Sequence, residues 1–429
     1  MTTSRRRWRH SVLTAVAAAG LNVFATASCG GGDGTTDARP DVANRCMRDA
    51  DCESPTGVCD VTGSGTCVEC TAEAAEACSG TTPVCGEDNT CAACSAHDQC
   101  ASGACAPDGS CAAETDVAYV GGPGATDNAT CTKATPCTKV AKALATNRNI
   151  VKFSGTSNEG APVIIDNQNV ALLANPGAKL VRTSNGIVLE VKGTSKVAIY
   201  DLEISGGSGA EGIGISLPAG NTANLSLTRV NVSGNAGGGI TATGGTLTVS
   251  QSTLSGNQGG AISVSGAGAT FVIVNNLMFN NGSNTAAYGA VDLTGDGNDT
   301  FAFNTLVLNQ ASNGAPTAIQ CSATLFTIAN NIVYDNGHAA GANPKIHKQG
   351  NCVVKSNIIG PGSPIANNMD IDPQLVDEPD DLQLKASSPA RGAADPLVPL
   401  AGLTATDFWG DPRPNPAGQQ ADLGADEAP

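Results

Sequence analysis

The chain has 429 residues, a formal net charge of −16, 41% hydrophobic residues and only 3% aromatic residues. This hydrophobic content is sufficient for a folded core, and the length favours more than one domain. Charged residues make up 14% of the sequence, which is too few for a coiled coil or a helical bundle. The acidic balance also excludes a nucleic-acid binder that follows phosphates, because such a protein needs rows of lysine and arginine.

Residues 1–28 have the pattern of a signal peptide. Four arginines (Arg5, Arg6, Arg7 and Arg9) form a basic start, and the stretch 11–27 consists mainly of apolar and small residues. A transmembrane helix is the alternative, but the apolar run is shorter than the roughly 20 residues that a span requires. Removal of this segment would take the formal charge from −16 to −20.

The sequence Thr26-Ala27-Ser28-Cys29 resembles the lipobox of bacterial lipoproteins, although Thr26 stands where leucine is usual. The resemblance implies that Cys29 is the lipidated first residue of the mature protein and that residues 29–45 are a flexible tether. It also implies a membrane partner, reached through the lipid, and a location in the outer membrane or on the cell surface of a Gram-negative bacterium. A secreted protein without a lipid is the alternative.

Sixteen of the 17 cysteines follow Cys29, and an even number in an exported chain predicts disulfides. Twelve of them form three quartets within residues 46–113. The quartets are Cys46, Cys52, Cys59 and Cys67, then Cys70, Cys78, Cys85 and Cys91, then Cys94, Cys100, Cys105 and Cys111. These modules have little to bury, so disulfides worth about 2–4 kcal/mol each must stabilise them. Each quartet allows three pairings.

The C-x-x-C pairs between the quartets have two other interpretations. A redox motif needs a thioredoxin-like βαβ unit, which is missing, and a zinc site needs a compartment that keeps thiols reduced. We therefore expect a disulfide-rich stalk. It resembles the cysteine-rich stalk repeats of delta-proteobacterial lipoproteins, which implies no activity.

Residues 151–360 repeat a unit of two short apolar segments, separated by Asn or Gly and followed by a glycine-rich turn. Strand-like starts recur at spacings of 27, 28, 22, 24, 30, 25 and 27 residues, at Val170, Val197, Leu225, Leu247, Phe271, Phe301, Phe326 and Val353. Such a period indicates stacked units, and the absence of helical periodicity excludes βαβ repeats. The sequence predicts an all-β solenoid of about eight or nine coils, with Gly and Asn in left-handed conformations at the corners.

Two further expectations follow from stacked coils. Asn276, Asn331 and Asn357 each precede an equivalent apolar segment, so we expect an asparagine ladder rather than sugar-binding amides. Cys321 and Cys352 follow comparable strands, and neighbouring coils rise by about 4.8 Å, which is within the reach of a disulfide. We therefore predict a disulfide between these two coils.

The body resembles the right-handed parallel β-helix of the pectate-lyase-like superfamily. Residues 117–150 are similar to the N-terminal cap of such domains, and this similarity implies a disulfide between Cys131 and Cys137. Residues 361–429 contain Asp372-Pro373-Gln374-Leu375, Asp407-Phe408-Trp409-Gly410 and Asp422-Leu423-Gly424-Ala425-Asp426-Glu427 in order. That series resembles the terminal segment of choice-of-anchor Q proteins, so we expect it to cap the β-helix.

A lyase of this fold needs a basic residue and a cation near the substrate carboxylate, and a hydrolase needs clustered acids; neither set is evident. Asp292, Asp296 and Asp299 resemble one unit of a calcium-binding nonapeptide repeat, but a single unit is more typical of a solvated turn. No other metal or cofactor is expected.

Other polar and aromatic residues are weaker candidates. Four early cations offer an anion-binding surface or simply a solvated one: Lys179, Arg182, Lys192 and Lys196. His338 and His347 have no acidic partner at catalytic spacing, and Tyr288 and Trp409 are too scattered to form a sugar-binding trough. We expect a non-catalytic surface protein for adhesion or weak polysaccharide or envelope recognition. A polysaccharide lyase or glycoside hydrolase is the alternative, and a structural spacer is the third possibility.

Overall fold

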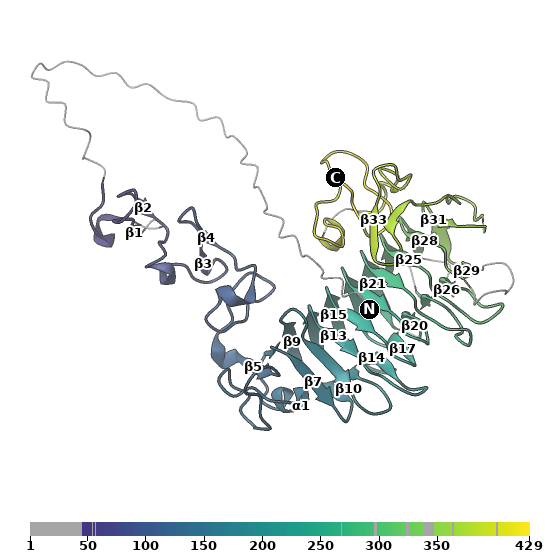
Figure 1. Ribbon diagram of the computed structural model, residues 1–429, viewed down its shortest axis with the longest axis horizontal. Coiled ribbons are helices and arrows are strands. Elements are labelled where there is room, and N and C mark those ends of the chain that lie inside the picture. The colour runs from purple at the N-terminus through teal and green to yellow at the C-terminus, as the bar shows by residue number, and fades with distance from the viewer. Residues whose placement is uncertain are drawn as a thin grey trace, which may run out of the picture.

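The computed structural model describes residues 45–429 except 54, 56, 267, 296–297, 323–325, 338–346, 363 and 400–401. Three small modules lead into a parallel β-solenoid, and an irregular C-terminal segment lies against the later coils (Figure 1). Cys29, the expected signal peptide and all but the last residue of the expected tether lie outside the described residues. In the part that is described, no helix is long and apolar enough to cross a membrane.

Each small module contains one short helical turn and, in the first two, a two-stranded ribbon. These elements are η1 (Asp49–Asp51), β1 (Val58–Cys59), β2 (Cys67–Val68), η2 (Ala75–Ala77), β3 (Val84–Cys85), β4 (Cys91–Ala92) and η3 (His97–Gln99). The turn η4 (Glu114–Asp116) then leads into the solenoid. With so little regular structure, the modules depend on their disulfides for stability.

The solenoid consists of three parallel sheets that each coil visits in turn. The first sheet contains β5 (Val117–Val120), β6 (Ile150–Phe153), β9 (Asn169–Ala174), β12 (Lys196–Tyr200), β15 (Asn224–Thr228), β18 (Thr246–Ser250), β21 (Thr270–Val274), β24 (Thr300–Ala302), β27 (Thr327–Ala329) and β30 (Val353–Lys355). The second contains β7 (Thr156–Glu159), β10 (Lys179–Arg182), β13 (Glu203–Ser205), β16 (Asn231–Ser233), β19 (Thr253–Ser255), β22 (Leu277–Phe279), β25 (Thr305–Val307), β28 (Ile332–Tyr334) and β31 (Ile358–Gly360). The third contains β8 (Val163–Asp166), β11 (Leu189–Lys192), β14 (Ile213–Leu217), β17 (Gly238–Ala242), β20 (Ile262–Val264), β23 (Val291–Leu293), β26 (Ile319–Cys321) and β29 (Lys348–Gly350).

This architecture confirms the predicted all-β, right-handed parallel solenoid behind a disulfide-rich region. Alternate residues point inward and stack on equivalent residues of the next coil, as Val170, Val197 and Leu225 do. Eight strands in the third sheet are joined by seven complete turns, which is slightly fewer than the expected eight or nine coils.

The predicted register is wrong in the last coils. Phe301 pairs with Ile273 instead of Phe271, and Phe301 also pairs with Ile328 instead of Phe326. Asp299 occupies the position opposite Phe271 and accepts a hydrogen bond from its backbone amide at 2.7 Å. Phe271 and Phe326 are therefore each two positions out of register with Phe301, so the three aromatic residues do not mark equivalent positions.

The corners between the first and second sheets form a row of residues with φ between 50° and 61°. This corner row consists of Asp201, Arg229, Gln251, Asn275, Phe303, Asn330 and Ser356. Only two members are asparagine and none is glycine. The expected glycines with positive φ lie at other corners, such as Gly193, Gly220 and Gly245 between the third and first sheets. Charged and aromatic residues occupy some of these positions, where their side chains contact neighbours outside their own coil. Arg229 bonds to Asp201 on the preceding coil, and Phe303 lies against Arg413 of the C-terminal segment.

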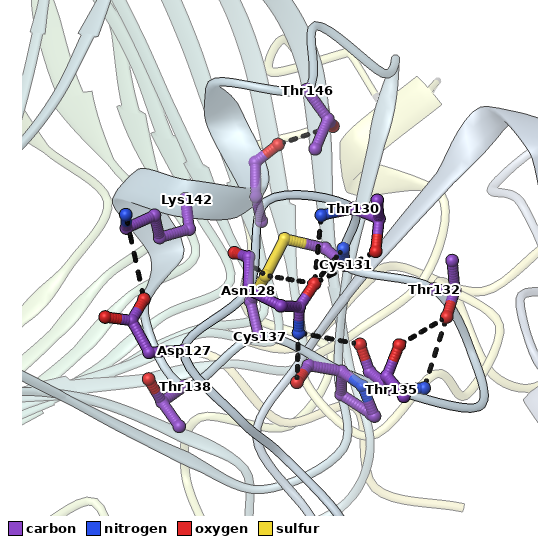
Figure 2. The surroundings of a disulfide bond; sticks show 12 residues. Asp127, Asn128, Thr130, Cys131, Thr132, Thr135, Cys137, Thr138, Lys142 and Thr146 are labelled. Atoms are coloured by element: carbon purple, nitrogen blue, oxygen red, sulfur yellow. Dashed lines mark hydrogen bonds and ion pairs between the residues drawn. A yellow bond between two sulfur atoms is a disulfide. The ribbon is translucent and has the colours of Figure 1, made fainter.

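The N-terminal end of the solenoid is closed by a disulfide-bonded loop and by α1 (Val140–Leu144), both of which contribute to the main core. Figure 2 shows how Asn128 holds this loop: its Oδ1 accepts bonds from the amides of Thr130 and Cys131, and its Nδ2 donates to Thr135 O. Lys142 of α1 lies 3.7 Å from Asp127 in the same loop.

The C-terminal segment contains β32 (Leu375–Asp377), β33 (Asp381–Leu384) and η5 (Gly402–Thr404). It covers the later part of the corner row. Asn275 Nδ2 donates to Leu403 O and Thr406 O, Gln251 donates to Asp407 O, and the guanidinium of Arg413 lies 4.4 Å from the ring centroid of Phe303. Much of the segment therefore lies along the side of the solenoid.

Candidate functional site

From β11 onward, the outer face of the third sheet presents a polar side chain at the same position of each strand, beginning with Glu190, whereas β8 carries Ile164 there. Strand pairing aligns six of them in register: Ser216, Thr241, Ser263, Asp292, Gln320 and Gln349. We call this set the polar row. Its neighbours along each strand, such as Val291 and Leu293, point into the core, so the pleat directs the polar row outward. The arrangement offers hydrogen-bonding groups at a spacing of about 4.8 Å along the solenoid axis.

Asp292 lies at the centre of the polar row and is partly buried there. Burial raises the pKa of its carboxyl group above the usual value, and among the described residues no hydrogen-bond donor is assigned to it. Tyr288 is its aromatic neighbour: its hydroxyl is hydrogen-bonded to Ser263, and burial, followed by the charge of Asp292, raises its pKa. A half-buried carboxylate beside a tyrosine edge is suited to accept hydrogen bonds from hydroxyl groups.

Tyr288 is held in place by a glycine. The ring lies against Gly260, which has a φ of 107° and would bring an added Cβ to 2.2 Å from the Tyr288 Cε2 atom. Only glycine satisfies both the backbone conformation and this close approach. Nothing in the sequence pattern marked the pairing of Gly260 with Tyr288, because the two residues come from different turns.

The three candidate calcium ligands are not brought together in the described residues. Asp292 faces outward, whereas Asp299 is buried and bonded to the Phe271 amide, and Asp296 lies outside the described residues. Within the described ranges, the groups of three potential ligands that converge are all disulfide cysteines.

The four early cations lie on different faces. Lys179 of the second sheet pairs with Glu203 at 2.8 Å, and Lys192 of the third sheet lies 3.5 Å from Glu190. Lys196 is on the first sheet, and Arg182 points inward and donates to Asn185 O. They do not form one cationic surface, because each coil passes through all three sheets and residues that are close in sequence lie on different faces.

The remaining candidates are also dispersed. His347 is fully buried, with Nε2 3.3 Å from Pro361 O, and His338 lies outside the described residues. Trp409 is 41% exposed and packs edge-on against Phe408 in the C-terminal segment, whereas Tyr288 lies beside Ser263 and Asp292 of the polar row. The two aromatic residues therefore belong to different parts of the molecule.

Two asparagine ladders run through the interior. The structure places Asn276, Asn331 and Asn357 in one ladder, with Asn304 between the first two, and each side-chain amide donates to the next Oδ1 at 3.0–3.1 Å. The sequence reasoning missed a second ladder of Asn235, Asn257, Asn281, Asn309 and Asn336, with distances of 2.8–2.9 Å. Asparagines recurring five residues after those of the first ladder were the available signal. Both ladders are buried, so their amides stabilise coils rather than contact sugars.

Within the described residues, sixteen cysteines form eight disulfides. All three quartets pair the first cysteine with the third and the second with the fourth: Cys46–Cys59, Cys52–Cys67, Cys70–Cys85, Cys78–Cys91, Cys94–Cys105 and Cys100–Cys111. Cys131 pairs with Cys137, and Cys321 pairs with Cys352 across neighbouring coils at a Cα separation of 5.8 Å. This disulfide content indicates an extracellular or exported protein.

Residues 26–118 match a family of unknown function, DUF8331, a region that includes the three disulfide-rich modules but hardly reaches the solenoid. No curated protein matches the chain.

Proposed function

We propose that the protein is a non-catalytic surface protein that recognises a polysaccharide through the polar row. The supporting observation is the alignment of Ser216, Thr241, Ser263, Asp292, Gln320 and Gln349 on successive coils. A linear polymer lying along the solenoid would meet one hydrogen-bonding group per coil. Many weak contacts of this kind suit adhesion, because their number rather than their individual strength determines retention.

The charge of the polar row favours a neutral polysaccharide. Asp292 is the one ionisable member of the polar row, and Glu190 continues the same register next to Ser216. These two carboxylates would repel a polyanion locally. Neutral sugar hydroxyls, by contrast, donate well to a carboxylate.

We further propose attachment to the outer membrane or cell surface through lipidated Cys29. The lipobox-like sequence before it and the disulfides after it support export, and the choice-of-anchor Q resemblance of residues 361–429 supports a surface location. The modules would then separate the solenoid from the membrane.

A binding panel tests the recognition proposal. The full chain is titrated with neutral and acidic polysaccharides, beside a variant of the polar row carrying Thr241→Val, Ser263→Ala and Gln320→Ala. A control carries Asn224→Ala, Ser226→Ala and Thr248→Val on the outer face of the first sheet. We expect the polar-row variant to weaken neutral-polysaccharide binding by about tenfold or more, since three hydrogen bonds are lost, and the control to bind as the natural chain does.

Two outcomes contradict the proposal: equal loss in both variants, or no binding to any polysaccharide in the panel. Release of shortened or unsaturated sugars during incubation would favour the lyase or hydrolase alternative. For the anchor, Cys29→Ala should move the protein from the membrane fraction to the soluble fraction, and unchanged partitioning would exclude lipidation at Cys29.

A further inference from the structure

The third disulfide module packs directly on the solenoid. Ala104 and Ala112 of the module contact a group of outward-facing side chains from the first sheet, which includes Tyr119, Leu173 and Tyr200. Tyr119 donates its hydroxyl hydrogen to Ser102 O at 2.8 Å, and Lys133 Nζ lies 2.5 Å from Ala101 O. We call this contact the module seam.

Lys152 lies within the module seam. It pairs in register with Tyr119 on one side and Leu173 on the other, and it points to the same outer face as both. Its side chain is only 2% exposed, and its Nζ atom has no hydrogen-bond partner among the described residues. An ammonium group in such a place is costly, because burial removes water without supplying a counter-ion.

The groups around Lys152 do not neutralise it. The negative charge of Asp201 attracts the Lys152 ammonium group, but both carboxylate oxygens of Asp201 already accept hydrogen bonds from Arg229, at 2.7 and 2.9 Å. From the module, His97 faces the seam, and its Nδ1 accepts a bond from the Cys105 amide at 3.2 Å. Tyr200 adds a phenol rather than a charge in the relevant pH range, since burial raises its pKa.

Tyr119 and Arg148 lie at the far edge of the module seam. Burial, followed by the charge of Glu114, raises the pKa of Tyr119 to about 12, so this phenol stays neutral as well. Arg148 donates to Val117 O and Cys131 O. The two groups that change charge between alkaline and mildly acidic pH are therefore Lys152 and His97.

We propose that the module seam is a latch that loosens on acidification, with Lys152 and His97 as the groups that release it. Burial lowers the pKa of Lys152 from 10.5 to about 7. Burial, followed by the charge of Lys152, lowers the pKa of His97 below 6.5. In the undocked state both groups are exposed and recover their ordinary pKa values.

The direction of the effect follows from these shifts. As pH falls from 10.5 to about 7, the undocked module binds a proton at Lys152 that the docked module excludes, so docking weakens progressively. Below pH 6.5, His97 takes up a proton more readily in the undocked module than in the docked one, so docking weakens further. Below these docked-state pKa values no further weakening arises from either group.

Hydrogen–deuterium exchange of the full chain, corrected for intrinsic rates, tests the latch at about pH 9 and about pH 5.5. We expect the peptide covering residues 101–106 of the module to lose protection by about tenfold or more at the lower pH. Peptides from β17 to β22 should stay protected at both values, which shows that the solenoid remains folded.

Lys152→Met keeps the length of the side chain without its charge, and Lys142→Met on α1, where the lysine is exposed, is the matched control. The first variant should retain the smaller response due to His97, and the control should respond as the natural chain does. His97→Asn, which preserves an acceptor for the Cys105 amide, serves as an independent variant and should retain only the Lys152 response. Equal protection at both pH values in the natural chain, or a full response in both Lys152→Met and His97→Asn, would overturn the proposal.

Discussion

Asn304 and Asn331 lie on neighbouring coils, and the side-chain amide of Asn304 donates to Oδ1 of Asn331 over 3.1 Å. The same amide donates to Ile273 O on the preceding coil and to Ala302 O on its own coil. One side chain thus connects three successive coils, and both Asn304 and Asn331 are fully buried. This arrangement explains why the polar ladder is compatible with an apolar core.

Replacing Asn304 by alanine should destabilise the solenoid by about 1–3 kcal/mol, because the donors and acceptors it leaves remain buried without partners. Urea unfolding of the full chain, followed by circular dichroism, measures the effect. The control is Asn224→Ala, which removes an exposed asparagine from β15. Equal stabilities of the two variants would contradict a stabilising role for the ladder.

Reduction should unfold the three modules before the solenoid. The modules have few buried side chains besides cysteine, whereas the solenoid has a continuous core from Ala118 to Ile359. Limited proteolysis after partial reduction should therefore cut within residues 46–111 while strand circular dichroism persists. Loss of the strand signal at the same reductant concentration would show that the two parts depend on one another.

Stability of the C-terminal segment should increase as pH falls from about 8 to about 5. Burial raises the pKa of Asp426 from 3.8 to about 7, so the folded state takes up a proton in a range where the unfolded state does not. Burial also raises the pKa values of Asp407 and Glu427, which changes the stability in the same direction. Thermal unfolding at several pH values measures this slope.

The Asp426→Asn variant should have a smaller slope than the natural chain, because it lacks the carboxyl group that takes up the proton. Its amide oxygen can still accept the hydrogen bond that Leu384 N donates to Asp426 at 2.8 Å. Glu211→Gln, on an exposed turn, is the control and should leave the slope unchanged. An unaltered slope in the Asp426 variant would assign the pH dependence to other groups.

Arg413→Met should release the C-terminal segment from the corner row. Arg413 lies 3.3 Å from Glu427, donates to Asp422 O and Gly424 O, and stacks on Phe303. Removing one partner of a fully buried ion pair costs about 3–5 kcal/mol, because the remaining charge loses its counter-ion. Proteolysis after residue 385 should become faster than in Arg391→Lys, and an unchanged rate would contradict the anchoring role.

Several features of the structure could be predicted from the sequence because they recur in it. The period of the apolar segments predicted the parallel solenoid, and the even set of sixteen cysteines predicted an oxidised, exported chain. Asn276, Asn331 and Asn357 marked a ladder because a stacked coil repeats its buried polar positions. The second ladder was equally periodic, with Asn281, Asn309 and Asn336 each five residues after a member of the first.

Other features depend on contacts that one coil's sequence does not contain. Asp299 rather than Phe301 lies opposite Phe271, and the coil distributes Lys179, Lys192 and Lys196 over three sheets. The pairing of each cysteine quartet is decided by which two cysteines the module's turns bring within reach.

By itself, the sequence determined the periodic part of this protein: the strands, the inward apolar positions and the existence of disulfides, because alternation and spacing are local properties of the chain. Only the tertiary structure decided that Lys152 is buried beneath the third module, that Asp292 lies between Ser263 and Gln320, and that the C-terminal segment covers Phe303. Each of these depends on surfaces that are distant in sequence and meet only after the coils have stacked, so the burial that sets their chemistry has no local signal.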